Sequence, residues 1–322
     1  MTTKPFKPLL AASLDGVDPK TLAFPLMWSP KLDGIRVLVH PDHGAVTRKI
    51  KRIPNDKIFA QLSDPLLNGF DGEIVFGPVT DKDVFNRTQA SVMKIEGPGM
   101  DEPFRIGGQK EASEAGSGMG GTYLVFDDFS MVGLPFSVRY ANLEERVSQL
   151  PERLKAFVKI VPHYTVETDV DLGNIERVIV EQGYEGVMLR HPGGGYKFGR
   201  STVNEMILAK VKRFADTDGT VIGFEEMMHN DNEKVRDALG NAKRATLQEN
   251  MRPAGTLGAL IVELPEFGGV TVKVGSGYTD ELKQSIWDNQ AAWLGSGIVL
   301  KYQPSGMKDL PRFPVFKGRR KD

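Results

Sequence analysis

Residues 29–40 read SPKLDGIRVLVH, and this stretch decides how the rest of the chain is interpreted. Its apolar end, Ile35 to Val39, predicts a strand. A lysine, an acid and a glycine precede that strand and an arginine lies within it, although lysine is costly to bury and glycine weakens a strand. The stretch is therefore either a turn between two strands or a functional site. Taken alone, Lys31 is an ordinary surface lysine, so the rest of the chain has to decide between the two.

Length and composition limit the class of protein. The chain has 322 residues, a length that suggests about two domains. It contains no cysteine, which excludes disulfides, thiol catalysis and zinc sites built on cysteine, and which fits the cytoplasm. The first residues lack the apolar core of a signal peptide, and no apolar run approaches the roughly 20 residues that span a membrane. We expect a cytoplasmic protein without a membrane partner.

Positive charge is gathered in three blocks, although the formal net charge of the whole chain is −1. Residues 31–57 carry seven Lys and Arg against three Asp and Glu, residues 190–213 carry six against one, and residues 301–322 carry seven against two. The net charges of the blocks are therefore +4, +5 and +5. Such blocks attract polyanions even when the whole chain is nearly neutral. From charge alone, three solvated surface faces remain an equal alternative.

The first 213 residues mix predicted strands with predicted helices, which indicates an α+β domain. Strands are predicted at residues 35–39, 72–77, 122–129, 186–190 and 206–214. Helices are predicted at 141–157 and at 172–183, where Gly183 is the expected C-cap. Residues 97–121 hold eight glycines and two prolines, so we expect a loop there.

From about residue 214 the pattern changes to short strands. They are predicted at residues 220–226, 258–265, 270–277 and 298–304, with one helix at 280–289. This combination is typical of a small β-barrel of the OB type. A polar stretch at 228–256 is either a surface loop or an arm that grips a partner. We therefore expect two domains, residues 1–213 and residues 214–322.

Several residues that could carry chemistry follow Lys31 in order along the chain. Glu73 stands at the head of the predicted strand DGEIVF, Phe126 near the end of YLVFDDF, and Glu185 just before the strand GVMLR. Lys210 and Lys212 are two positions apart in LAKVKRF, so a strand would present both ammonium groups on one face, as a polyphosphate needs. Each residue alone is more often a surface or core residue, and only the ordered set argues for a site.

These stretches, in this order, resemble the motif series of the covalent nucleotidyltransferases, and most closely that of the ATP-dependent DNA ligases. KLDGIR resembles motif I, TRKIKRIPN motif Ia, DGEIV motif III, YLVFDDF motif IIIa, EGVMLR motif IV, LAKVKRF motif V and LPRFPVFKGRR motif VI. The resemblance covers nearly the whole chain. It implies an ATP-grasp-like adenylation domain of antiparallel sheets and helices, followed by an OB-fold domain.

The resemblance also implies a reaction and a role for each residue. A lysine attacks the α-phosphate of ATP, AMP passes to the 5′-phosphate of a nick in duplex DNA, and the 3′-hydroxyl then expels AMP. Lys31 would be the nucleophile, Glu73 would bind the ribose and Phe126 would stack on adenine. Glu185 would hold Mg²⁺, or Mn²⁺ in its place, and Lys210 and Lys212 would hold the α-phosphate.

Four basic residues complete the implied site. Arg36 and Arg48 would contact the nucleotide or the nick phosphate, and Arg312 and Lys317 would orient the leaving pyrophosphate. The resemblance further implies a monomer that acts on nicked duplex DNA in a bacterial or phage-infected bacterial cell.

Other classes share some of these features. An mRNA capping enzyme would use GTP with the same lysine, and an RNA ligase usually lacks the C-terminal barrel. An NAD-dependent DNA ligase would add an N-terminal domain and a cysteine zinc finger, which a chain without cysteine does not have. The non-enzyme alternative is an OB-fold protein that binds single strands, against which the lysine among cations argues.

Overall fold

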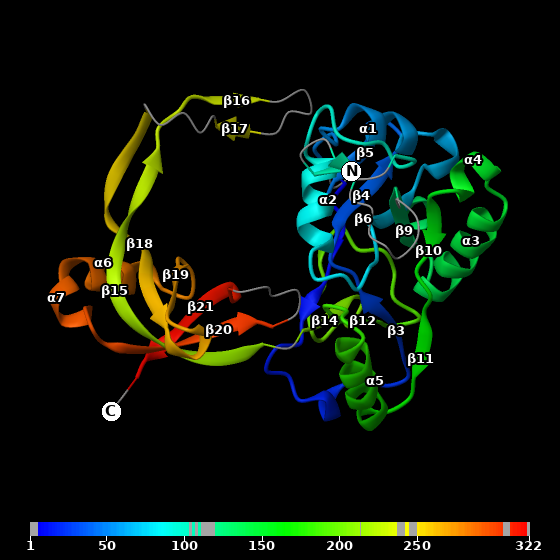
Figure 1. The fold of residues 1–322 in the computed structure, drawn as a ribbon. Coiled ribbons are helices and arrows are strands. Elements are labelled where there is room, and N and C mark those ends of the chain that lie inside the picture. The colour runs from blue at the N-terminus through cyan, green and yellow to red at the C-terminus, as the bar shows by residue number, and fades with distance from the viewer. Residues whose placement is uncertain are drawn as a thin grey trace, which may run out of the picture. The chain divides into compact units, whose positions relative to one another are not determined.

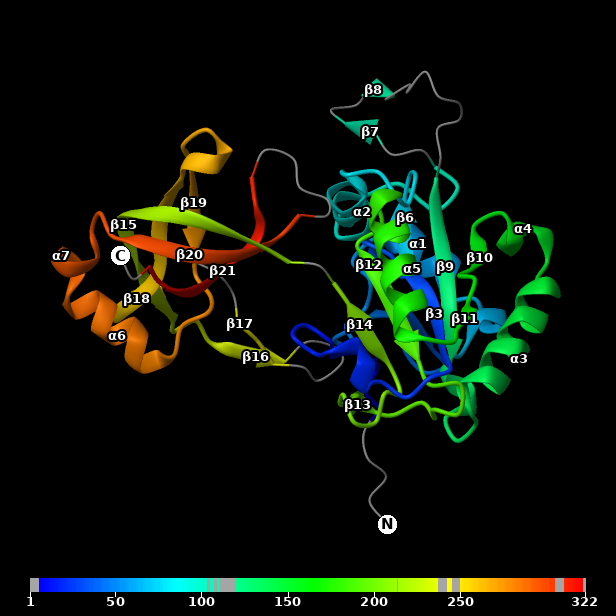
Figure 2. The ribbon, with the colours of Figure 1, turned by 90° about the horizontal axis from the view of Figure 1, so that it is seen from below.

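The computed structural model describes residues 6–102, 105–106, 109–110, 120–212, 214–236, 242–244, 250–304 and 310–320 (Figures 1 and 2). The chain divides into two compact units, Met1–Lys212 and Arg213–Asp322. Both units combine helices with mainly antiparallel sheets, so the predicted α+β class is confirmed. Parts of the predicted loop at 97–121 and of the polar stretch at 228–256 lie outside the described residues.

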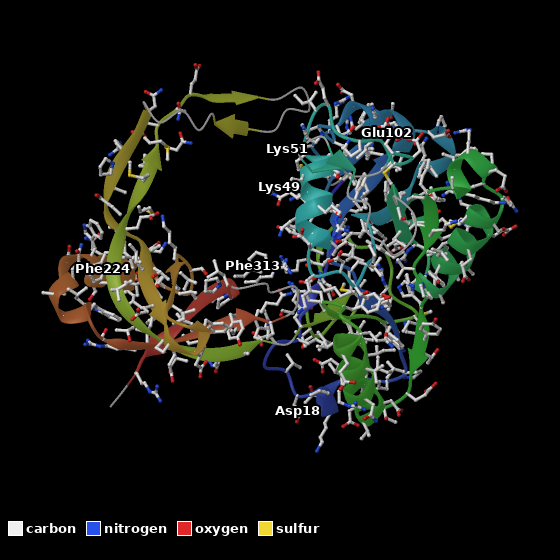
Figure 3. The ribbon with its side chains drawn as sticks, viewed as in Figure 1. Asp18, Lys49, Lys51, Glu102, Phe224 and Phe313 are labelled. Carbon is white, nitrogen blue, oxygen red and sulfur yellow. The ribbon has the colours of Figure 1, made fainter. Side chains whose placement is uncertain are left out.

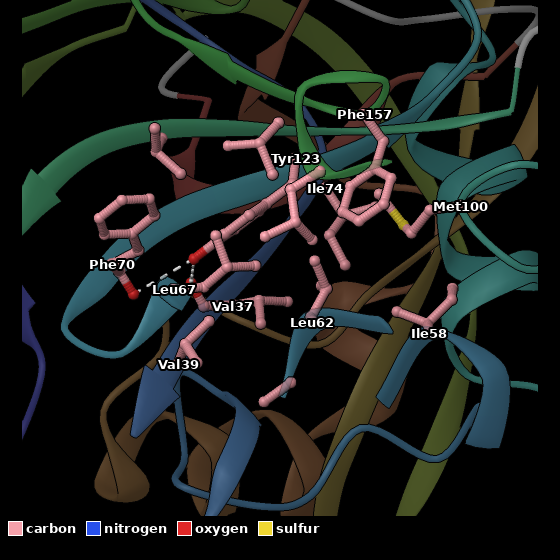
Figure 4. Close-up of a cluster of buried hydrophobic side chains, with 14 of the residues drawn as sticks. Val37, Val39, Ile58, Leu62, Leu67, Phe70, Ile74, Met100, Tyr123 and Phe157 are labelled. Atoms are coloured by element: carbon pink, nitrogen blue, oxygen red, sulfur yellow. Dashed lines mark hydrogen bonds between the residues drawn. The ribbon is translucent and has the colours of Figure 1, made fainter. Parts of the chain in front are cut away.

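The first sheet of the first unit has the order β10-β9-β6-β4-β5, and only the pair β10 and β9 is parallel. Its strands are Val158–Ile160, Gly121–Asp128, Phe70–Phe76, Ile35–His40 and Gly44–Thr47. Apolar side chains of this sheet and of neighbouring helices form a buried cluster, where the Tyr123 hydroxyl donates to the carbonyls of Val37 and Phe70 at 3.0 and 3.2 Å (Figure 4). The helices of this part of the chain are α1 (Asp56–Leu62), α2 (Val84–Val92), α3 (Phe136–Ser148) and α4 (Glu152–Lys155).

The second sheet of this unit has the order β11-β3-β12-β14-β2. Its strands are Tyr164–Val166, Leu26–Lys31, Gly186–Arg190, Ala209–Val211 and Ala12–Ser13. Leu26, Val187 and Leu189 pack in one core cluster with Leu172 and Ile179 of α5 (Asp169–Glu181). Because side chains alternate along a strand, the other face of β3 and β12 carries Ser29, Lys31, Met188 and Arg190. The short strands β1 (Leu9–Leu10) and β13 (Gly199–Arg200) pair in parallel.

The second unit is built on one antiparallel sheet of order β19-β18-β15-β20-β21. These strands are Val270–Val274, Met251–Leu264, Ala215–Asn230, Gly297–Gln303 and Arg312–Arg319. The helices α6 (Asp280–Asp288) and α7 (Gln290–Trp293) accompany the sheet, and Ile286 of α6 packs in its core. The predicted OB-type architecture is confirmed.

Some predicted elements have different bounds. The helix predicted at 141–157 is two helices, because Pro151 lies between them as the N-cap residue of α4. The strand predicted at 206–214 is reduced to the three residues of β14. The predicted loop at 97–121 contains β7 (Arg105–Ile106) and β8 (Gln109–Lys110). The polar stretch at 228–256 includes the ends of β15 and β18 and the antiparallel pair of β16 (Lys234–Arg236) and β17 (Ala242–Arg244). Short 3-10 turns lie at Pro19–Thr21, Pro65–Leu67, Phe129–Met131 and Pro265–Phe267.

The helices offer no membrane-crossing segment within the described ranges, since none of them there combines sufficient length with sufficient apolar character.

Candidate active site

Strand pairing brings the predicted motifs I, IV and V to one place in the second sheet. Lys31 is the last residue of β3, and its partner on β12 is Gly186, the residue after Glu185. On the other side of β12, Val187 pairs with Val211, the residue before Lys212. Residues that are 154 and 27 positions apart in the sequence therefore contact one another across three adjacent strands.

The carboxylate of Glu185 binds both lysines. Its Oε2 accepts a hydrogen bond from Nζ of Lys31, and its Oε1 accepts one from Nζ of Lys212. Nζ of Lys31 also donates to the carbonyl oxygen of Leu32 at 3.2 Å. The side chains of Lys31 and Lys212 are 19% and 16% exposed, whereas Glu185 is 4% exposed. A buried acid therefore holds two ammonium groups that keep some access to solvent.

Two glycines make this arrangement possible. Gly186 has a φ of +149°, and a Cβ atom there would collide with the carbonyl oxygen of Val211 on β14. A Cβ atom at Gly34, in the turn after Lys31, would collide with the carbonyl oxygen of Ile74 on β6. The glycines of KLDG and YEGV are thus required where backbone segments approach closely beside the lysine.

The electrostatics of the cluster favour the charged forms of Lys31 and Glu185. Burial lowers the pKa of Lys31, but the carboxylates of Glu185 and Glu73 outweigh burial and raise this pKa above its usual value. Burial raises the pKa of Glu185, and the two lysines outweigh it, so that the net pKa lies below the ordinary range. Lys210, on the neighbouring strand, has a lowered pKa because of burial and the charges of Lys212 and Lys31. At neutral pH Lys31, with Glu185 as its partner, is therefore an ammonium ion.

The first sheet contributes Glu73 and Arg36. Oε1 of Glu73 accepts a hydrogen bond from the amide of Gly34 at 2.8 Å, which ties β6 to the turn after Lys31. Glu73 and Arg36 are direct partners across β6 and β4. Arg36 is fixed by Asp71, with Nε to Oδ1 at 2.8 Å and Nη2 to Oδ2 at 2.5 Å.

Phe126 belongs to the same part of the first sheet. The centre of its ring lies 5.6 Å from Cζ of Arg36 and 5.7 Å from Cζ of Arg190. The structure therefore brings Lys31, Glu185, Lys210 and Lys212 together in one sheet, and Glu73, Arg36 and Phe126 together in the sheet that adjoins Lys31 through Gly34.

Sequence reasoning missed a set of buried charges next to Phe126. Asp71, Asp127 and Arg139 are 0% exposed, and Arg190 is 3% exposed. Asp127 binds Arg139 with Nε to Oδ1 at 2.8 Å and Arg190 with Nη1 to Oδ2 at 2.6 Å. The signal was present, because an acid inside the apolar run TYLVFDD needs a buried partner.

Three further predicted residues belong to other elements of the chain. Arg48 is exposed in the turn after β5, and among the residues the structure describes it has no hydrogen bond or ion pair. Lys49 and Lys51 of the same turn are labelled in Figure 3. Arg312 and Lys317 belong to β21 of the second unit, where Nζ of Lys317 donates to Asp216 at 2.6 Å and Arg312 lies 5.2 Å from the ring centre of exposed Phe313 (Figure 3). The predicted roles of Arg48, Arg312 and Lys317 stay predictions.

The fold and this lysine-centred site define a covalent nucleotidyltransferase with an OB-type domain. The sequence profile of the ATP dependent DNA ligase domain matches residues 8–212, and that of the DNA ligase OB-like domain matches residues 250–320. The chain belongs to the ATP-dependent DNA ligases. It is an enzyme that uses ATP, and the capping and RNA ligase alternatives are not supported.

Solved structures agree with this assignment. The chain is 30% identical to a Chlorella virus DNA ligase-adenylate, with a TM-score of 0.51 and coverage of 98% of this chain and 99% of that chain. A Lig E DNA ligase, studied for DNA binding with a minimal scaffold, shares the fold with a TM-score of 0.65 at 21% identity, over 99% of this chain and 100% of that chain. No curated protein gave a significant match.

Proposed function

We propose that this DNA ligase seals nicks between a 3′-hydroxyl and a 5′-phosphate through an AMP group carried by Lys31. Nζ of Lys31 attacks the α-phosphorus of ATP, a phosphoramidate bond forms, and pyrophosphate leaves. The 5′-phosphate of the nick then displaces Lys31, and the 3′-hydroxyl displaces AMP. The observation that carries the proposal is the pairing of Lys31 with Glu185, which strand register places beside Lys212.

The amine of Lys31 has to lose a proton before it can attack. In the structure the pKa of Lys31 is raised, against the effect of burial, mainly by Glu185. We propose that the triphosphate attracts Lys210 and Lys212, and that Glu185 turns away from Lys31 when the nucleotide binds. Loss of its carboxylate partner then lowers the pKa of Lys31, and the ammonium group releases a proton to water, which leaves a neutral amine.

A divalent cation fits this donor set. Mg²⁺ is commonly bound by one or two carboxylates together with substrate phosphates and water, and Glu185 supplies one carboxylate beside the proposed phosphate site. Among the described residues no group of three or more His, Asp or Glu is placed to hold a metal by itself. We propose that Glu185 holds Mg²⁺, with Mn²⁺ as a substitute. When bound, the ion neutralises charge on the phosphates.

The other residues divide between base, ribose and phosphates. We propose that Phe126 stacks on adenine and that Glu73 accepts a hydrogen bond from the ribose, since both lie on the first sheet and Glu73 contacts the turn after Lys31. Arg36, Lys210 and Lys212 provide positive charge for the phosphates. Three further residues complete the assignment: Arg48 at the nick phosphate, and Arg312 and Lys317 at the leaving pyrophosphate.

The division of labour follows the two expected domains, adenylation by residues 1–213 and closure by the OB-fold domain of residues 214–322. We propose that the polar stretch at 228–256 is an arm that contacts duplex DNA. Its deletion should weaken binding to nicked DNA, and binding should weaken further as salt rises, because phosphate contacts release counterions. Unchanged affinity after deletion would reject the arm. The enzyme would act as a monomer in the cytoplasm of a bacterial or phage-infected bacterial cell, an environment that suits a chain without cysteine.

Covalent labelling tests the proposed function. The protein and Mg²⁺ are incubated in parallel with α-labelled ATP, GTP or NAD⁺, and the label is chased with nicked DNA. We expect labelling by ATP alone, release of the label by nicked DNA, and no labelling of Lys31→Ala. Labelling by GTP, or label that nicked DNA does not release, would contradict the proposal.

A further inference from the structure

A buried ionic network lies behind Phe126, and the chemistry proposed for Lys31 does not use it. Its centre is the carboxylate of Asp127. Oδ1 accepts hydrogen bonds from Nε of Arg139 and from the amide of Asp128, both at 2.8 Å. Oδ2 accepts hydrogen bonds from Nη1 of Arg190 at 2.6 Å and from Nη2 of Arg139 at 3.2 Å. Four donors occupy this carboxylate, so its position is fixed.

Arg190 connects the two sheets of the first unit. It ends β12 of the second sheet, whereas Asp127 lies on β9 of the first sheet. Arg190 is on the same face of β12 as Gly186, the register partner of Lys31, because positions two and four apart share a face. The ion pair between Arg190 and Asp127 therefore sets the spacing between the strand beside Lys31 and the strand that carries Phe126.

Phe126 depends on its neighbours for its position. In the pairing of β6 with β9, Asp71 faces Asp127 and Gly72 faces Val125, so Phe126 has no register partner on β6. Such a bulge re-aims a side chain and leaves its residue outside the ladder. Two guanidinium groups lie next to the ring of Phe126. The distance from the ring centre to Cζ is 5.6 Å for Arg36 and 5.7 Å for Arg190.

Charge balance alone does not explain why Arg190 is buried beside Asp127. Arg139 already binds both oxygens of Asp127, and it donates further to the carbonyls of Leu134 and Gly194 at 2.5 and 2.9 Å. Arg190 adds a second buried guanidinium to a carboxylate that is already paired, which costs desolvation energy. Its guanidinium also lies 4.3 Å from the ring centre of Phe136, so aromatic rings flank it on the α3 side as well.

We propose that Arg190, held by Asp127, is a positioning residue. It fixes the ring of Phe126 in the position from which the ring stacks on the purine base of the nucleoside triphosphate. Arg190 does not touch the nucleotide in this account; it acts through Phe126. The inference rests on the proposed function, because it takes Phe126 as the group that stacks on the base.

A double-mutant cycle on the KM for ATP in self-adenylation tests the inference. Arg190→Met keeps an unbranched apolar side chain and removes the guanidinium. We expect it to raise this KM about tenfold in the wild-type background, since an aromatic ring that is no longer held in place stacks less well on a base. In the Phe126→Ala background the same substitution should change the KM less than about twofold. The matched control is Arg177→Met, which removes an exposed arginine of α5 paired with Glu181 at 3.2 Å and should leave the KM unchanged.

The rate at saturating ATP separates positioning from damage to the fold. We expect this rate to fall less than the KM rises, and Arg190→Lys, which retains the charge with a single donor group, to restore part of the KM. If Arg190→Met does not fold, Arg190→Lys is carried through the cycle instead. Equal effects of the substitution in both backgrounds, or an unchanged KM, would overturn the inference while leaving Lys31 chemistry intact. If Phe126→Ala itself leaves the KM unchanged, the stacking role in the proposed function is wrong.

Discussion

The proposed phosphate side and the proposed base side of the site hold their charges in different ways. At Lys31 a single carboxylate, Glu185, is shared by two ammonium groups that keep some exposure. Beside Phe126, the carboxylates of Asp71 and Asp127 are 0% exposed and accept three and four hydrogen bonds respectively. We expect the first arrangement, but not the second, to exchange partners when a polyanion arrives. We propose that the chemistry at Lys31 uses movable charges and that recognition of the base uses fixed ones.

The largest effect is expected from a substitution of Glu185. Glu185→Gln keeps the shape but removes the charge that orders Lys31 and Lys212 and that a cation would use. We expect the initial rate of self-adenylation to fall about a thousandfold, as when a group that stabilises transition-state charge is lost. The control is Glu205→Gln, in an exposed pair with Lys197 at 2.7 Å, which should stay within about twofold of wild type. A Glu185→Gln enzyme within tenfold of the wild-type rate would contradict the movable-charge account.

The buried charges of the proposed base side should contribute to the free energy of unfolding. Asp71→Ala leaves the guanidinium of Arg36 and the hydroxyl of Tyr196 without their buried partner. We expect the free energy of unfolding, measured with urea, to fall by about 3 kcal/mol or more. Asp56→Ala removes an exposed partner of Arg52 and should cost less than about 1 kcal/mol. Equal losses in the two variants would mean that the base side is no more fixed than the surface.

A smaller effect on stability is expected from His163, whose pKa depends on burial and on the charge of Arg190. Burial, and next to it the charge of Arg190, lower the pKa of His163 to about 3. The unfolded chain titrates near the usual value of about 6.5, so between these values it binds a proton that the folded chain does not. Stability attributable to His163 is therefore lost as the pH falls below about 6.5, by about 1 kcal/mol at pH ~5.5 relative to pH ~7.5.

His163→Phe tests this pH dependence. The ring of His163 packs edge-on against Phe136 and Tyr140, with ring centres 5.0 and 4.6 Å away, so a phenyl ring suits the position. Urea unfolding of wild type and variant at the two pH values should show the variant gaining about 1 kcal/mol relative to wild type at the lower pH. The same difference at both values would show that His163 titrates normally in the folded protein.

The movable side of the site is predictable from the sequence. Lys31 and Glu185 stand in short motifs with a glycine neighbour, Lys212 stands in the basic motif LAKVKRF, and the order of the motifs implies that the three residues meet. The OB-type strands are likewise visible as short apolar runs, and Thr279 caps α6 just before the predicted start of that helix. Local pattern is sufficient here because neighbouring residues carry the information.

The fixed side is not predictable in the same way. Arg139 lies on α3, where a charged residue reads as solvent-facing, and Arg190 ends a short apolar strand. Their common partner, Asp127, is 12 residues from Arg139 and 63 residues from Arg190. Which arginines meet a buried acid is decided by tertiary packing, and a single sequence gives no measure of it. The acid itself could have been flagged, because a charge inside an apolar strand requires a partner.

Mapping the site of adenylation tests the central claim most directly, because three lysines lie close to the proposed phosphate position. The protein would be labelled with α-labelled ATP, digested under conditions that preserve the phosphoramidate, and analysed by mass spectrometry. We predict that AMP is found on the peptide of Lys31 alone and that Lys31→Arg carries none. AMP on Lys210 or Lys212, or labelling that survives in Lys31→Arg, would contradict the account.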